Sequence, residues 1–371
     1  MIEVALTLTD EQRELSAVVR QFVTDKAPSA AVRRWSESPE GLDQSVWRQM
    51  ADQLGLQGLA IPEAYGGGGF GPFELGLVQQ ELGRVLFPGP FFASVVLAGQ
   101  ALTASGDRGA MERWLPGIAD GSLTATVAVS EGHGPQVSNP AMTARPAKAG
   151  VVLAGRKTLV VDGDTAELIL MTATGPHGPA LYALNADAEG VRRRRLDALD
   201  PTRRLGVIEV TDAPAIQVGP AGENYLHRVL GLATVGLAAE QVGGASACLD
   251  SAVDYAGTRV QFGRPIGSFQ AIKHKCADMV MEVEAARAAA LHALSAAAED
   301  PEELLFAAAV AGSYCASAYT RVAKEHVQIH GGVGFTWEHD AHLHLKRAKT
   351  GQRLFGSPVH HRGRLADLVG F

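Results

Sequence analysis

The C-terminal part of the chain constrains the fold most, because it holds three long apolar patterns with helical spacing. They run from about Tyr225 to Arg259, from Ser268 to Asp300 and from Glu302 to His330, with short connections between them. Helices of this length joined by short connections indicate an antiparallel bundle. A shorter pattern follows from Glu338 to about Lys349. We therefore expect a C-terminal four-helix bundle over residues 221–371.

The middle of the chain has a different character, with short β-rich runs separated by Gly, Pro and Asp. No long helical pattern lies between them, which favours a small β-barrel or sandwich over βαβ units. The N-terminal part is again helical, and Thr9 with Gln12 forms a predicted capping box. We expect domains over 1–121, 122–220 and 221–371. The expected strands are Thr124–Val129, Val151–Val161, Ala166–Ala173, Ala180–Leu184 and Gly206–Val210.

Composition excludes several classes of protein. The 371 residues are 46% hydrophobic, enough for two or three domains, and the net charge is −7. The one dense basic run, Arg192 to Arg195, is interpreted as a solvated loop, so we expect no nucleic-acid partner. The cysteines, Cys248, Cys276 and Cys315, form no CxxC pair and indicate reduced core thiols without a disulfide framework or metal site.

Targeting signals are not evident either. Met1 to Thr9 lack a basic region followed by an apolar run, and no stretch of about 18 apolar residues is free of charge. We expect no signal peptide, no membrane span and a cytoplasmic location. Gly66, Gly68 and Gly71 match G-x-G-x-x-G, but Pro62–Ala64 replace the strand that a dinucleotide fingerprint needs before it. A turn between two helices is the better interpretation.

The segment from Tyr255 to Met279 is the most informative. A helix end, a Gly-Pro turn and a new helix would explain its glycines and Pro265, but not Arg259 and Gln270 flanking the turn with Phe262 between them. An arginine can bind phosphate oxygens with its forked guanidinium. A glutamine offers both a donor and an acceptor, and a phenylalanine offers a flat face to an aromatic ring.

This segment resembles the acyl-CoA dehydrogenase pattern Arg-x-x-Phe-Gly-x-Pro-Ile-x-x-Phe-Gln, and matches it at every fixed position. In that family the Arg and Gln contact the FAD of the neighbouring subunit, which implies cofactor roles for Arg259, Phe262 and Gln270. A second stretch resembles the family's Gln-x-x-Gly-Gly-x-Gly-Phe and implies FAD contacts for Gln328, Ile329, Gly331 and Gly332. The alternative for this stretch is a glycine-capped helix end.

The resemblance covers nearly the whole chain. Pro62–Gly68 is similar to the family's N-terminal loop, and the order of helices, β domain and helical bundle agrees. The implied fold is therefore an N-terminal α-helical domain, a middle β-barrel or sandwich and a C-terminal four-helix bundle. The implied chemistry removes the α-proton of an acyl-CoA thioester while hydride leaves the β-carbon for the flavin, and it needs a carboxylate base.

That base is missing at both positions where the family carries it. Phe355 occupies the usual glutamate position, and Ala233 occupies the alternative position on the preceding long helix. The nearest acids on that helix, Glu223 and Glu240, are out of register, and we interpret Glu240 as a polar-face residue of the bundle. We therefore expect no catalytic residue in this chain and no metal ligand.

The middle domain departs from the family as well. The Thr-Glu-Pro-x-x-Gly-Ser-Asp loop that touches flavin and substrate corresponds to Ser130–Gly134, in which only Ser130 remains as a candidate FAD contact. The Trp-x-Thr stretch corresponds to Leu159–Val161. The residues that would hold FAD across an interface are thus kept, whereas those that would form this subunit's own isoalloxazine site are eroded.

This asymmetry leaves four hypotheses open. The favoured one is a partner subunit of a heteromeric acyl-CoA dehydrogenase, similar to actinobacterial α2β2 members with half of their sites functional, which often act on steroid side-chain thioesters. The others are a self-sufficient dehydrogenase with a relocated base, a flavin monooxygenase of the same fold, and a flavin-free scaffold. The expected partners are an acyl-CoA substrate and a homologous subunit or a second copy, in a dimer of dimers.

Overall fold

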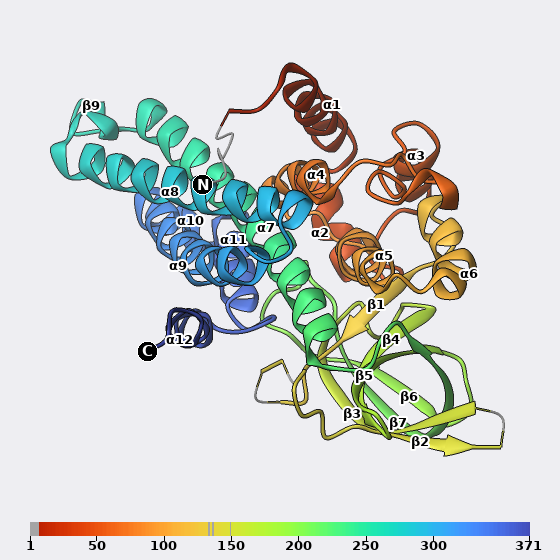
Figure 1. The fold of residues 1–371 in the computed structure, drawn as a ribbon. Coiled ribbons are helices and arrows are strands. Elements are labelled where there is room, and N and C mark those ends of the chain that lie inside the picture. The colour runs from red at the N-terminus through yellow and green to blue at the C-terminus, as the bar shows by residue number, and fades with distance from the viewer. Residues whose placement is uncertain (1–6, 133, 136, 149) are drawn as a thin grey trace.

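The protein is described by a computed structural model that covers residues 7–132, 134–135, 137–148 and 150–371. Two helical regions enclose a β region in sequence, and the β region lies at one end of the molecule (Figure 1). The predicted fold class, helical then β then helical, is confirmed. Part of the segment used to predict the absence of a signal peptide, residues 1–6, and the loop residue His133 lie outside the described residues.

The N-terminal region consists of short helices around an apolar core. The Thr9 hydroxyl accepts from the Gln12 amide while the Gln12 side chain accepts from the Thr9 amide, which confirms the predicted capping box. The glycine-rich segment that begins at Gly66 links a short 3-10 turn to a helix, as predicted. The elements are α1 (Asp10–Lys26), α2 (Ser29–Glu37), α3 (Gln44–Asp52), η1 (Glu63–Tyr65), α4 (Pro72–Arg84), the π-helix η2 (Phe92–Gly99), α5 (Gln100–Ser105) and α6 (Arg108–Ala119).

The middle region is a closed barrel. Strand β4 pairs with β2 and with β5, and the ring β4-β2-β3-β7-β5 closes on itself, with β1 beside β4 and β6 beside β7. Closure removes unpaired edges and encloses a small apolar interior. The strands are β1 (Ala125–Ala128), β2 (Thr143–Ala147), β3 (Gly150–Val161), β4 (Leu168–Gly175), β5 (Gly178–Asn185), β6 (Val191–Arg195) and β7 (Leu205–Val218).

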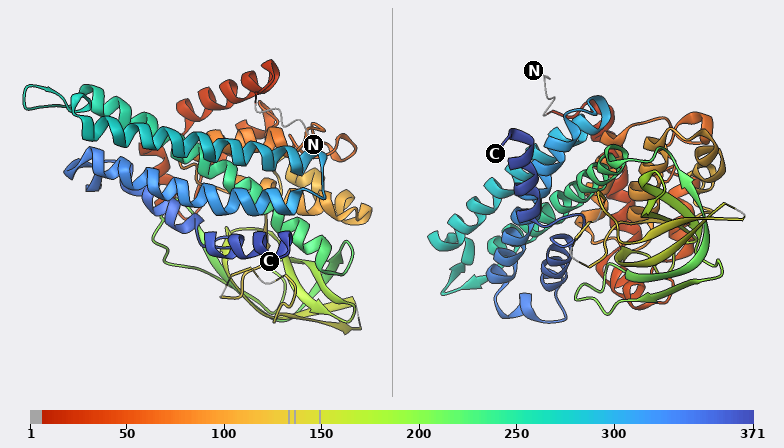
Figure 2. Two further views of the ribbon diagram at one scale, coloured as in Figure 1. Left: turned by 60° about the vertical axis from the view of Figure 1, so that its left-hand side comes forward. Right: turned by 60° about the horizontal axis from the view of Figure 1, so that its bottom comes forward.

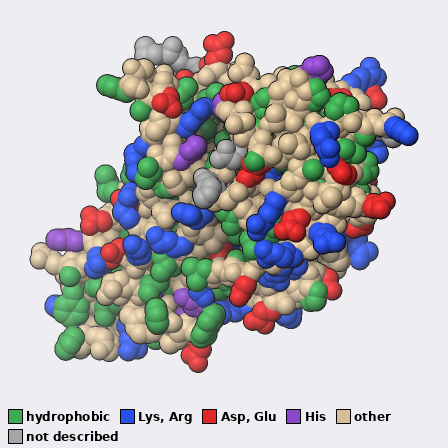
Figure 3. Space-filling model, turned by 90° about the horizontal axis from the view of Figure 1, so that it is seen from below, with side chains coloured by type: hydrophobic (Ala, Val, Ile, Leu, Met, Phe, Trp, Pro, Cys, Tyr) green, Lys and Arg blue, Asp and Glu red, His purple; other side chains and the backbone are tan. Residues whose placement is uncertain are grey.

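The interpretation of Arg192–Arg195 as a loop was wrong. These residues form most of β6, because each pairs with a residue of β7 from Glu209 to Gly206. Alternating exposure along β6 leaves the arginines mostly on the surface. On the face seen in Figure 3, basic and acidic side chains are interspersed. Two arginines of the barrel form ion pairs, Arg193 with Asp187 and Arg156 with Glu209.

The C-terminal region packs the long helices α7 (Glu223–Thr258), α8 (Gln270–Glu299) and α9 (Leu304–His330) against one another. The α7 helix also crosses α4 with direct backbone contact: a Cβ on Gly243 would lie 1.9 Å from the Gln80 carbonyl oxygen. By length and composition α7 could cross a membrane, but 89% of its apolar window is buried inside the protein, as in a core helix. The shorter elements are β8 (Val260–Gln261), β9 (Arg264–Pro265), η3 (Ile266–Ser268), α10 (Gly332–Phe335), α11 (Ala341–Gly351) and α12 (Pro358–Val369).

Candidate functional site

One end of the helical bundle projects from the molecule (Figure 2, left). The chain passes from α7 to α8 at this end, within the segment that carries the first predicted cofactor motif. Here α7 ends at Thr258, the hairpin β8–β9 turns the chain, and α8 begins at Gln270. Phe262 and Gly263 both have positive φ, 54° and 77°, as a two-residue type I′ turn requires. A phenylalanine in this conformation is strained, and its ring is 93% exposed. An exposed, strained aromatic residue indicates a contact outside this chain.

Arg259 lies at the base of this hairpin. Its backbone amide donates to the Tyr255 carbonyl, and its carbonyl accepts from the Ile266 amide at 2.8 Å, so both ends of the residue are fixed. The side chain is exposed, and within the described part of the chain its guanidinium has no ion-pair partner. Five N–H donors are therefore available for a ligand or a neighbouring subunit.

The end of α9 lies at the same projecting end. Gln328 is exposed and Ile329 is buried, so only the glutamine side chain is available to a ligand. Gly331 has a φ of 60°, and a Cβ on Gly331 or Gly332 would meet nothing within 4 Å. The open backbone therefore leaves room for a group from outside the chain. We call the surface formed by Arg259, Phe262, Gln270, Gln328, Gly331 and Gly332 the bundle tip.

Ser130 is not part of the bundle tip; it lies on the barrel. Its carbonyl accepts from the Thr158 amide at 2.9 Å, which brings it beside Leu159–Val161, the other segment predicted to depart from the family pattern. Within the described residues its hydroxyl oxygen is buried without a hydrogen-bond partner. The next residue, Glu131, accepts from the fully buried Lys157 at 2.7 Å and from two backbone amides of the loop that it closes. Burial lowers the pKa of Lys157 to about 8.

The two expected base positions are both apolar and buried. Phe355 and Ala233 belong to one core cluster, which also contains Phe92 of η2. The rings of Phe355 and Phe92 lie 6.2 Å apart between centroids. The π-helix η2 packs directly on α7, where a Cβ on Gly236 would lie 2.3 Å from Val96. Side chains thus fill the interior between η2 and α7.

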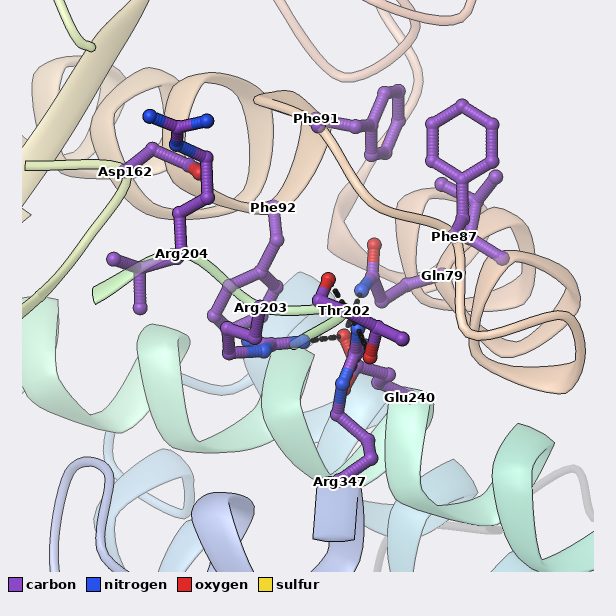
Figure 4. Close-up of a pocket in the computed structure, with 13 residues that line it drawn as sticks. Gln79, Phe87, Phe91, Phe92, Asp162, Thr202, Arg203, Arg204, Glu240 and Arg347 are labelled. Carbon is purple, nitrogen blue, oxygen red and sulfur yellow. Dashed lines mark hydrogen bonds and ion pairs between the residues drawn. The ribbon is translucent and has the colours of Figure 1, made fainter. Parts of the chain in front are cut away.

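A buried polar cluster continues from this apolar core (Figure 4). Glu240 of α7 pairs with Arg203 of the barrel and, at 3.3 Å, with Arg347 of α11. Arg347 also binds Asp200 at 2.8 Å. Burial alone would raise the pKa of Glu240, but the two guanidinium groups outweigh burial and hold that pKa below its ordinary value. Glu240 is therefore an ionised weak base, and the interpretation as a polar-face residue was wrong because its side chain is buried.

Arg203 links the polar cluster to the aromatic pair. Its guanidinium lies 4.7 Å from the centroid of the Phe92 ring. The adjoining cavity, lined by Val161 and Asp162 among others, has a volume of about 20 Å³, which is room for one water molecule. Burial raises the pKa of Asp162 to about 7. The cavity holds charged groups, but it has no space for an acyl thioester.

Comparison with known proteins agrees with this arrangement. A model of the acyl-CoA dehydrogenase N-terminal domain matches residues 9–122, and a model of the C-terminal domain matches residues 221–369. The chain belongs to the acyl-CoA dehydrogenase family. It is 33% identical over 369 residues to the acyl-CoA dehydrogenase IpdE2 of Mycobacterium tuberculosis, covering 98% of this chain and 99% of the relative.

Two solved members of the family have the same fold. The Tcur3481-Tcur3483 steroid ACAD is 35% identical, with a TM-score of 0.91 and 98% of each chain covered. The ChsE4-ChsE5 complex from Mycobacterium tuberculosis is 30% identical, with a TM-score of 0.91 and 99% of each chain covered.

Two features of this acyl-CoA dehydrogenase chain were missed from the sequence. The ion cluster joins Asp200, Arg203, Glu240 and Arg347, which are up to 147 residues apart, and nothing in their spacing predicts the contact. The second feature is a group of histidines, His326, His330 and His339, next to the bundle tip. The His-Gly-Gly step of the second motif is the available signal for His330.

Proposed function

We propose that this chain is a partner subunit that completes the FAD site of a homologous catalytic subunit in the α,β-dehydrogenation of an acyl-CoA thioester. The observation that carries the proposal is the contrast between its two regions. The bundle tip is exposed and presents the unpaired Arg259, whereas the expected base positions, Phe355 and Ala233, are buried and apolar. A subunit of this kind contributes binding residues to a partner's site without chemistry at its own.

The bundle tip fits FAD in its chemistry. A forked guanidinium suits phosphate oxygens, the exposed Phe262 ring offers an aromatic face, and the open backbone at Gly331 and Gly332 admits close approach. When bound, FAD supplies the hydride acceptor. In our proposal Arg259, Phe262, Gln270, Gln328, Gly331 and Gly332 bind and orient it, the buried Ile329 does not contact it through its side chain, and Ser130 is retained as a candidate contact on the barrel.

The relatives support a heteromeric assembly and a substrate class. One neighbour is a steroid ACAD and another is a two-component complex. We propose by analogy that this chain pairs with a homologous subunit in a dimer of dimers, in the cytoplasm, and acts on acyl-CoA thioesters derived from steroids. This part of the proposal rests on likeness and not on the shape of an acyl pocket.

The test is the flavin spectrum of the protein purified alone and with its co-encoded homologue. We expect little bound FAD for the chain alone and full FAD, with dehydrogenase activity, in the complex. Activity in the complex should disappear when the partner's catalytic glutamate is replaced. Full FAD and turnover by the single chain would favour a self-sufficient enzyme. Full FAD with oxygen-dependent oxidation would favour a monooxygenase. A complex without flavin would favour a scaffold.

A further inference from the structure

The histidine group beside the bundle tip has two possible uses, of which metal binding is the first. One ring nitrogen from each of His326, His330 and His339 lies within 4.8 Å of the others. Two imidazole nitrogens on one zinc ion are about 3.3 Å apart, from Zn–N distances of about 2.0–2.1 Å in a tetrahedron. His339 also uses its Nδ1 lone pair to accept from the Ala341 amide at 3.1 Å, so the neutral ring carries its proton on the other nitrogen. As arranged, these rings are not a ligand set.

The second possibility is suggested by how the rings pack. The ring of Tyr255 stacks on His330, with centroids 4.3 Å apart and planes inclined by 22°. The centroid of the His330 ring in turn lies 4.3 Å from that of the His339 ring, with the planes inclined by 43°. The Nδ1 of His330 faces the His326 backbone carbonyl at 2.9 Å, and since a carbonyl can only accept, this nitrogen carries the proton. The hydrogen bond fixes the orientation of the His330 ring within the stack.

The stack joins separate segments of the bundle tip. Tyr255 lies one helical turn before Arg259, whose amide donates to the Tyr255 carbonyl. His330 is directly followed by Gly331 and Gly332. His339 belongs to the segment before α11, which Arg33 of α2 anchors by donating to the His339 carbonyl at 3.0 Å and pairing with Asp340.

We propose that Tyr255, His330 and His339 are positioning residues that fix the spacing between Arg259 and the Gly331–Gly332 backbone. This inference rests on the proposed function, because a cofactor that contacts both segments is sensitive to their spacing. None of the three rings needs to touch the cofactor. Their ring contacts hold the ends of α7 and α9 in one arrangement before FAD binds, so the ordering cost is lower at binding.

The magnitude follows from the strength of one aromatic contact. Such a contact contributes enough to change FAD affinity by about two- to tenfold when it is removed. Tyr255→Phe keeps the ring and should retain wild-type affinity, whereas Tyr255→Leu should lose it. His330→Leu should cause at least as large a loss, because it removes the contacts with both Tyr255 and His339, and the double variant should be no worse than His330→Leu alone.

The experiment measures FAD affinity by flavin fluorescence in the assembled complex, together with the unfolding midpoint of each variant. Tyr314 is a half-buried tyrosine on α9, about four turns before His330. The matched control Tyr314→Leu should leave FAD affinity unchanged. If Tyr255→Leu does not fold, His339→Leu at the half-buried end of the stack carries the same test.

Two results would overturn the inference: independent, additive losses in the double variant, or equal affinity in Tyr255→Phe and Tyr255→Leu. Arg259→Ala separates this failure from a failure of the proposed function. If Arg259→Ala releases FAD while the stack variants do not, only the positioning role is wrong. If Arg259→Ala also retains FAD, the bundle tip does not hold the cofactor and both proposals fall.

Discussion

The ring of Phe355 lies against the ring of Phe92 at a centroid distance of 6.2 Å, in the same apolar cluster as Ala233. On the Phe92 ring rests the guanidinium of Arg203, which is paired with Glu240. A continuous row of side chains therefore leads from the expected position of the catalytic base to a neutralised ion cluster.

Asp162→Asn should stabilise the protein at pH 8. Burial raises the folded-state pKa of Asp162 from 3.8 to about 7. Between these two pH values the folded protein therefore holds a proton on Asp162 that the unfolded chain releases. Stability contributed by the protonated carboxyl is therefore lost as the pH rises from about 4 to 7. Asparagine removes the titration and tolerates the φ of 51°. Unfolding free energies by urea titration at pH 8 and pH 5 should show the gain shrinking as the pH falls.

Asp212→Asn is the matched control, because Asp212 has a φ of 52° and an exposed side chain. It separates the backbone effect of asparagine from the effect of burial. An equal gain from Asp162→Asn at both pH values would show that the Asp162 carboxyl is not held protonated by the fold.

Arg347→Met should be strongly destabilising. It would leave the fully buried Asp200 and the buried Glu240 without this cation, and breaking a buried ion pair typically costs about 3–5 kcal/mol. Arg145→Met removes an arginine whose pair with Asp212 is 60% and 58% exposed, so its cost should stay below about 1 kcal/mol. Urea midpoints at pH 7 measure both costs. Similar midpoints for the two variants would mean that solvent reaches the buried cluster.

Arg259→Ala should release FAD from the complex. A hydrogen bond to a charged group contributes roughly 1.5–3 kcal/mol, which corresponds to about ten- to a hundredfold weaker retention. Arg259→Lys should also weaken retention, because a point charge replaces the fork. The FAD content after gel filtration, read from the flavin absorbance per protein, measures the effect. Unchanged content in both variants would make Arg259 a surface residue that ends its helix.

The sequence predicted the arrangement of elements better than the contacts between them. Helical spacing located α7, α8 and α9 to within a few residues. A long helix that buries one face repeats apolar residues at helical spacing, and this pattern can be recognised in the sequence alone. The four arginines of β6 misled, because their pairing with β7 depends on residues far along the chain. The sequence correctly placed Glu240 on the long helix α7, but the prediction that its side chain faces solvent was wrong. Arg203 and Arg347, which pair with it, come from other regions of the fold.

The assembly should be a dimer of dimers in solution. Phe262, Phe335 and Trp337 are 93%, 83% and 72% exposed at or beside the bundle tip, and such aromatic residues indicate a surface covered by another subunit. Native mass spectrometry of the chain with its co-encoded homologue should give a tetrameric mass. A monomer under these conditions would contradict the prediction, and Trp337→Glu, which places a charge on this surface, should shift the assembly to smaller species.

The chain alone should not oxidise acyl-CoA thioesters at a measurable rate. Phe355 and Ala233 cannot accept a proton, Glu240 is held ionised by two arginines, and a general base typically contributes about 10²–10⁴-fold to the rate. The measurement is dehydrogenation of acyl-CoA by this chain alone and by the complex, with an artificial electron acceptor. Activity only in the complex, lost when the partner's glutamate is replaced, is the expected result.

Phe355→Glu should not create activity in the isolated chain. A carboxylate at this buried position would face the Phe92 ring, and burial would raise its pKa and favour the protonated form. In our proposal Val161 and the segment after Ser130 also lack the family's flavin contacts. Phe355→Gln is the control for volume and polarity without a titratable group. Robust turnover by the unmodified chain would show that a base has been misplaced.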